Sequence, residues 1–107
     1  MSDWTKEEIQ EIWEKATIVV GYNPSLWRKD QCGAWIYRLY YGAVALGEPH
    51  TSYRWQIDHN KSQSKDGQDV VSKAKPLQWF NNDSIQNGLL KTKITSDGNK
   101  NVEIDNK

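Results

Sequence analysis

An aspartate and a histidine stand side by side at Asp58-His59, after a short run of residues that favour a β-strand. Neighbouring side chains of a strand point to opposite faces, so the pair can act together only where the strand gives way to a loop. The polar segment after His59 supplies that loop. There an imidazole can act as a general base, because its pKa lies near neutrality. The carboxylate beside it can hold a divalent cation through oxygen.

Cleavage of a phosphodiester needs both of these parts. It requires a deprotonated water and a metal ion that stabilises the charge developing on the phosphate and on the leaving oxygen. A second oxygen ligand for that ion could come from an asparagine that a strand and a helix turn bring back. A lone histidine is more often an ordinary surface or core residue, so the surrounding pattern decides how His59 is interpreted.

That pattern resembles the HNH endonuclease motif, which has a ββα-metal fold. Its parts are the strand-like run 55–59, a long polar loop, and the run 76–82, which closes on Asn81-Asn82. The upstream run 27–36 and Tyr41-Gly42 resemble the segment that precedes the motif in one group of small bacterial HNH proteins. The resemblance covers roughly residues 22–88, which is most of the chain.

Carried over position by position, the resemblance implies roles for single residues. His59 would be the general base and Asp58 a metal ligand. Asn82 would be the second protein ligand, with Asn81 as the alternative; a helix N-cap is an equally good interpretation of Asn82 and can coexist with metal binding. The metal would be one Mg²⁺ or Mn²⁺ ion, and no small-molecule cofactor is implied. Candidates for contact with the DNA backbone are Arg54, Lys61, Lys65 and Lys75.

The chain differs from the family at the residues that support the loop of the site. The central asparagine that supports the loop falls at Lys73, a side chain with three donors and no acceptor. Loss of such support typically lowers metal affinity or activity by about 10–100-fold. The pattern therefore fits a weakened nuclease. It also fits a catalytically inactive HNH-like module that binds nucleic acid or a protein partner, for example a phage or mobile-element accessory factor. A structural domain with an incidental Asp-His pair is the third interpretation.

The elements that would position this site can be predicted in part. Thr5 and Glu8 form a capping-box pattern, which indicates the start of an amphipathic helix. The residues from 30 to 41 could begin as a helical turn and continue as a strand. The remaining pattern predicts a helix over 6–17, strands over 53–58 and 75–79, a short helix over 81–87, and either a hairpin around Asp97-Gly98 or a flexible tail.

Length and composition indicate the size of the fold and the residues available for its core. The chain has 107 residues, with 36% hydrophobic residues but 6 Trp and 5 Tyr, so a few large rings must supply much of the core. We expect an α+β fold in which an N-terminal helix precedes a small ββα-metal core. Residues 1–90 would form one domain, and the polar segment 91–107 would be dispensable for its core. The expected core is Trp13, Trp27, Trp35, Ile36, Trp55, Ile57, Leu77 and Trp79.

Charge and cysteine content limit the partners and the cellular location that can be expected for the chain. Lys and Arg number 14 and so do Asp and Glu, so the net charge is zero, with a mildly basic middle that suits contact with phosphate. Cys32 is the single cysteine, which excludes an intramolecular disulfide. The first residues are polar, and no apolar run is long enough to cross a membrane. We expect an intracellular, cytoplasmic protein, which could be encoded by a phage. Its expected partner is DNA, a protein partner is possible, and no contact with a membrane is expected.

Overall fold

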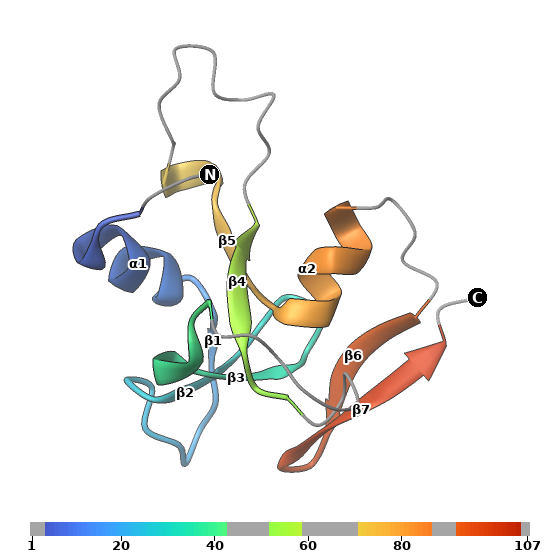
Figure 1. The fold of residues 1–107 in the computed structure, drawn as a ribbon. Coiled ribbons are helices and arrows are strands. Elements are labelled where there is room, and N and C mark those ends of the chain that lie inside the picture. Colours follow the sequence, from blue (N-terminus) through green and yellow to red (C-terminus); the bar gives the residue numbers. More distant parts are fainter. Residues whose placement is uncertain (1–3, 43–51, 59–70, 87–91, 106–107) are drawn as a thin grey trace.

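The computed structural model describes residues 4–42, 52–58, 71–86 and 92–105. These segments form helices and three small antiparallel sheets, which confirms the α+β class. Figure 1 shows α1 (Lys6–Trp13) and α2 (Trp79–Gln86) on either side of a hairpin made by β4 (Trp55–Asp58) and β5 (Lys75–Gln78). No helix in the described segments is long and apolar enough to cross a membrane.

Helix α1 begins at the expected capping box. Oγ1 of Thr5 accepts the backbone N–H of Glu8 at 3.1 Å, and a carboxylate oxygen of Glu8 accepts the backbone N–H of Thr5 at 2.9 Å. The helix ends at Trp13 rather than at residue 17. The amide of Ala16 donates to the carbonyl of Trp13, three residues back, so the last turn tightens and leads directly into a strand.

One sheet follows α1 along the chain. Its strands, in spatial order, are β1 (Thr17–Ile18), β2 (Trp27–Lys29) and β3 (Trp35–Tyr37). The sequence left open a helical turn at the start of residues 30–41, but a tight turn joins β2 to β3 there. A 3-10 helix, η1 (Arg38–Tyr40), follows β3. Asp30 makes this turn, because its Oδ1 accepts the backbone N–H groups of Cys32 and Ala34, both at 2.9 Å.

The core is centred on two tryptophans from distant parts of the chain. The rings of Trp13 and Trp55 lie 5.2 Å apart and tilted by 46°, and both side chains are fully buried. The expected core is confirmed at Trp13, Trp35, Ile36, Trp55 and Leu77. Ile57 is half-buried and packs against this core, whereas the expectation is wrong at Trp27 and Trp79, which are half-buried outside it. Further buried residues complete the core: Ile12 and Ala16, which fit the apolar spacing of the expected N-terminal helix, and Ala34, Ala74 and Ile94.

A second hairpin, β6 (Thr92–Asp97) and β7 (Lys100–Asp105), occupies the C-terminal segment. The turn between the strands contains Gly98 with a positive φ of 68°, a conformation that glycine adopts without strain. In Figure 1 this hairpin lies beside α2, on the opposite side of the molecule from α1.

This hairpin is packed into the fold, contrary to the expectation that it is dispensable. Ile94 is fully buried. The side chain of Asn101 acts as a strand partner for β3: its Oδ1 accepts the backbone N–H of Trp35 at 2.6 Å, and its Nδ2 donates to the carbonyl of Trp35 at 3.0 Å. The approach is so close that a Cβ on Gly33 would lie 2.7 Å from Oγ1 of Thr95.

The carboxylate of Asp30 ties the sheets together. Its Oδ1 closes the β2–β3 turn, and its Oδ2 accepts the backbone N–H of Gln78 at 2.9 Å and Nδ2 of Asn81 at 3.0 Å. Burial raises the pKa of Asp30, and the four hydrogen bonds oppose that rise. Because the folded pKa is raised, the associated stability is complete below the unfolded pKa and is lost as the pH rises through the folded pKa.

We therefore expect Asp30→Asn to lower the free energy of unfolding by at least about 3 kcal/mol. An asparagine offers one acceptor oxygen, so two of the four donors would face an NH₂ group instead of an oxygen. Urea melts followed by tryptophan fluorescence measure the change, with Asp97→Asn at the exposed end of β6 as the control. Equal melts for the two variants would contradict the role of Asp30.

A second expectation concerns the C-terminal hairpin. Asn101→Ala should lower the free energy of unfolding by about 2 kcal/mol, because it leaves the buried N–H and C=O groups of Trp35 without their side-chain partner. Asn99 is the matched control, since it is an exposed asparagine on the same hairpin. Thermal melts of both alanine variants decide the point, and a loss no larger than that of Asn99→Ala would mean that the hairpin only rests on the domain.

Candidate functional site

Asp58 is the last residue of β4, where the sequence places the end of this strand. Successive strand residues alternate between faces, so Asp58 shares a face with Gln56, and Trp55 points to the other one. Trp55 packs on Trp13 of α1. The face that bears Asp58 is therefore the one toward α2, and directly across it on β5 stands Lys75, whose Cα pairs with that of Asp58.

Asn82 comes from α2 to this same face of β4. Its Nδ2 donates to Oε1 of Gln56 at 3.0 Å. Its Oδ1 is buried without a hydrogen-bond partner; in the described segments the only other such side-chain atom is a donor, Nε1 of Trp79. A buried acceptor left unsatisfied costs about 1–3 kcal/mol, so this oxygen is suited to a further partner. The helix begins at Trp79, which places Asn82 inside it and not at its N-cap.

The start of α2 is capped instead by Gln78, a fully buried residue that the sequence analysis did not single out. Its Oε1 accepts the backbone N–H groups of Phe80 at 2.9 Å and of Asn81 at 3.2 Å. Its Nε2 donates to the carbonyl of Ser52 at 3.3 Å. Glutamine is not among the favoured N-cap residues, which is why the sequence contained no signal for this cap.

Asn81 has a different role from its neighbour. Its Nδ2 donates to Oδ2 of Asp30 at 3.0 Å and to the carbonyl of Ile94 at 2.8 Å, and its Oδ1 accepts the backbone N–H of Ile94 at 2.8 Å. The amide thus pairs with a strand of the C-terminal hairpin and with the buried carboxylate. Its oxygen is already used, so Asn81 supports α2 and is a poor candidate for a metal ligand.

The remaining predicted site residues are dispersed. The guanidinium of Arg54 lies over the ring of Tyr40 at 5.3 Å, at the opposite end of β4 from Asp58. Lys73 is exposed in the 3-10 helix η4 (Val71–Lys73), which leads into β5. Three of the predicted residues lie outside the described segments: His59, Lys61 and Lys65.

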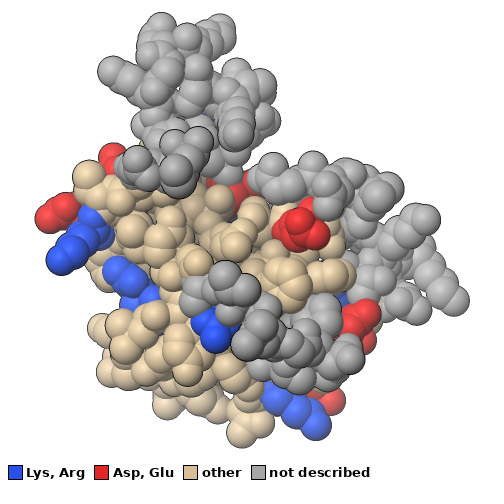
Figure 2. Space-filling model, viewed as in Figure 1, with Lys and Arg blue, Asp and Glu red and all other residues tan. Residues whose placement is uncertain are grey.

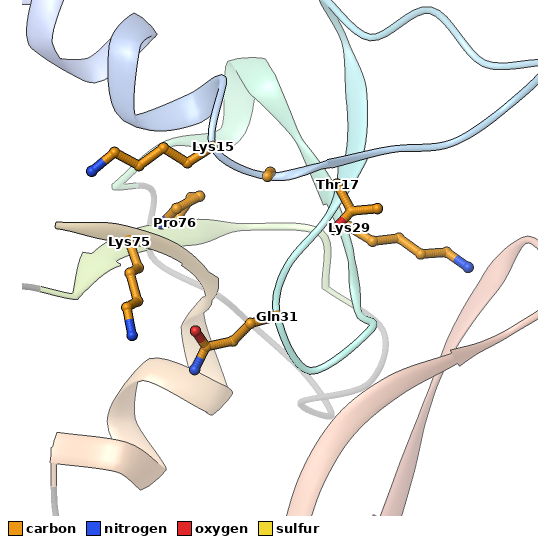
Figure 3. A pocket seen from close by; sticks show the side chains of 7 residues that line it. Lys15, Thr17, Lys29, Gln31, Lys75 and Pro76 are labelled. Carbon is orange, nitrogen blue, oxygen red and sulfur yellow. The ribbon is translucent and has the colours of Figure 1, made fainter. Parts of the chain in front are cut away.

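Lys75 also borders a cleft of about 250 Å³ between the end of α1, β2 and β5. Its lining residues are Lys15, Ala16, Thr17, Lys29, Gln31, Lys75 and Pro76. Figure 3 shows Lys75 and Gln31 extending toward the same side and Lys29 extending away from them. Nζ of Lys15 is already engaged, because it donates to the carbonyls of Val71 and Ala74. Burial lowers the pKa of Lys15, opposed by Glu11 and assisted by Lys75.

Positive charge is not concentrated on the face that Figure 2 presents. Lys and Arg side chains lie there in small separate groups, with Asp and Glu among them. This distribution agrees with the zero net charge of the chain. Any contact with nucleic acid on this face must therefore depend on a few well-placed cations.

The described segments contain no group of three or more His, Cys, Asp or Glu side chains that could hold a metal ion. The set that the structure brings to one face consists of a carboxylate, Asp58, and an amide oxygen, that of Asn82. His59 follows Asp58 directly in the sequence.

No protein-family model, no curated protein and no solved structure gives a match.

Proposed function

We propose that the chain is a divalent-metal-dependent DNA endonuclease of the HNH type. The observation that carries this proposal is the buried, unpartnered Oδ1 of Asn82, on the face of β4 that bears Asp58. Two antiparallel strands followed by a helix, β4, β5 and α2, form the order of elements that a ββα-metal motif requires.

The donor set suits a hard cation. Asp58 offers a carboxylate and Asn82 an amide carbonyl, which are oxygen ligands of the kind that Mg²⁺ and Mn²⁺ prefer. When bound, such an ion supplies stabilisation of the charge that develops on the phosphate during cleavage.

The protein's own groups would do the rest. In this proposal, His59 removes the proton from the attacking water through its imidazole. Lys75, directly across from Asp58, is placed to attract a backbone phosphate toward the carboxylate. The hydrogen bonds of Gln78 and Asn81 fix the first turn of α2, so that Asn82 keeps its orientation toward Gln56.

A non-catalytic module that binds nucleic acid or a protein is the second candidate, and Lys73 favours it. Lysine stands where the family has a bracing asparagine, and it has no acceptor with which to hold a loop. The two candidates differ in one observable: the module would bind its partner and leave plasmid DNA intact.

His59→Ala tests the proposed base. Wild-type protein should nick supercoiled plasmid with Mg²⁺ or Mn²⁺ and not with EDTA, and His59→Ala should lower the rate by about 100-fold or more with an unchanged melting temperature. The control is His50→Ala, which removes the other histidine of the chain. Wild-type rates in His59→Ala would refute the assignment, and intact plasmid in all samples would favour the module.

Asn82→Ala tests the proposed ligand. The variant should bind Mn²⁺ at least about 10-fold more weakly than the wild type, because it lacks the oxygen that the ion would take from α2. Calorimetric titration measures the affinity, and Asn99→Ala, which removes an exposed amide, is the control. If wild type and Asn82→Ala bind Mn²⁺ equally, the ion lies elsewhere or has no specific site.

A further inference from the structure

Five aromatic side chains lie on and beside the sheet of β1, β2 and β3, and this aromatic strip consists of Tyr22, Trp27, Tyr37, Tyr40 and Tyr53; Tyr22 joins the others through the buried ring of Trp35. Trp27 is its centre, with ring centroids 4.7 Å from Tyr37 and 5.2 Å from Tyr53. Tyr40 extends the strip at 4.9 Å from Tyr37. At the other end, Tyr22 and Trp27 both contact the ring of Trp35, at 4.7 and 6.1 Å.

The strip lies on the face of the sheet opposite to Arg28 and Ile36; at one end of this face Trp35 is itself buried, and its Nε1 donates to the carbonyl of Gly98 in the C-terminal hairpin. Arg28 of β2 and Ile36 of β3 are paired and buried, so they face inward. Trp27 and Tyr37 are paired in the next register position and therefore face outward. All five rings keep solvent exposure, which reaches 41% for Tyr22 and 43% for Tyr40. Four tyrosines and a tryptophan are thus partly exposed to solvent on this face.

One cation lies over a ring of the strip, Tyr40, and another lies over the adjoining buried ring of Trp35. Nζ of Lys29 lies 4.8 Å from the centre of the Trp35 ring, and the guanidinium of Arg54 lies 5.3 Å from that of Tyr40. Within the two segments that build this face, 17–42 and 52–57, the single acid is Asp30. Its carboxylate is buried and bound by four hydrogen bonds, so in these two segments the charged groups that reach the surface are cations; the exposed Asp97 lies beyond them, next to Gly98 at the Trp35 end of the face.

We propose that the aromatic strip binds single-stranded nucleic acid, with bases stacking on the open rings and phosphates meeting Lys29 and Arg54. Alternation of rings and cations is how proteins hold single strands without reading their sequence. The bases of a duplex are stacked on each other and closed to such rings, and a neutral ligand would gain nothing from the cations. The proposal does not depend on metal binding or cleavage, because it concerns a different face of the fold.

Binding of a fluorescent, short oligothymidylate at low ionic strength, in EDTA, tests the proposal. Anisotropy should rise with wild-type protein, and Tyr40→Ala should weaken binding about 5-fold or more. Tyr40→Phe should retain the affinity, since it keeps the ring. Leu39→Ala is the matched control: Leu39 is the preceding residue of η1, is 68% exposed and has no ring. Lys29→Ala should lower the slope of log affinity against log salt by about 0.7.

The outcomes separate clearly when melts show every variant folded. Weaker binding in Tyr40→Ala with normal binding in Leu39→Ala and Tyr40→Phe supports the strip. The proposal is overturned if the wild type ignores the oligothymidylate, if Tyr40→Ala and Leu39→Ala bind equally, or if a duplex of the same length binds as well and is unaffected by Tyr40→Ala. Because EDTA is present throughout, failure here leaves the nuclease proposal to its own assay.

Discussion

Four hydrogen bonds converge on the carboxylate of Asp30, and the relative positions of the sheets depend on them. The donors come from the β2–β3 turn, from the end of β5 and from the first turn of α2. None of these elements is long enough to be stable alone. A buried carboxylate is costly unless its oxygens are satisfied, so the fold is favoured only when all the donors arrive together. One side chain thereby makes several short elements cooperative.

Two adjacent asparagines of α2, Asn81 and Asn82, have different roles. Consecutive helix residues point about 100° apart, so neighbours of identical type meet different surroundings. Asn81 faces the C-terminal hairpin and bonds to the backbone of Ile94 and to the carboxylate of Asp30, whereas Asn82 faces β4 and keeps an unpaired oxygen. The hydrogen bonds of Asn81 fix the helix, and the side-chain oxygen of Asn82 is therefore held in a defined position. Rigid placement of this kind is what a metal ligand or a binding group requires.

Local patterns in the sequence were sufficient for the capping box, for the end of β4 at Asp58 and for the start of β5 at Lys75. They were insufficient where a partner is distant in the chain. The cap by Gln78 and the strand-like role of Asn101 depend on groups that only tertiary structure brings near. Trp27 was expected in the core because large rings must supply much of a small core, but the size of a ring does not reveal which face of a strand it lies on. Asn81 and Asn82 could not be told apart without the direction of the helix.

The pairing of Trp35 with Asn101 joins residues 66 positions apart, and it has a consequence for how the chain folds. The β2–β3 hairpin can close early, since its contacts are local; at its outer edge the carbonyl of Tyr53 accepts the N–H of Tyr37, and Asn101 of β7 supplies the partner for Trp35. Contacts of such long sequence separation carry a large loop-closure cost and slow the folding of small domains. On the ribosome, β3 would emerge long before its partner and would expose an unpaired strand edge meanwhile. The hairpin of β6 and β7 is thus the element whose arrival completes the fold.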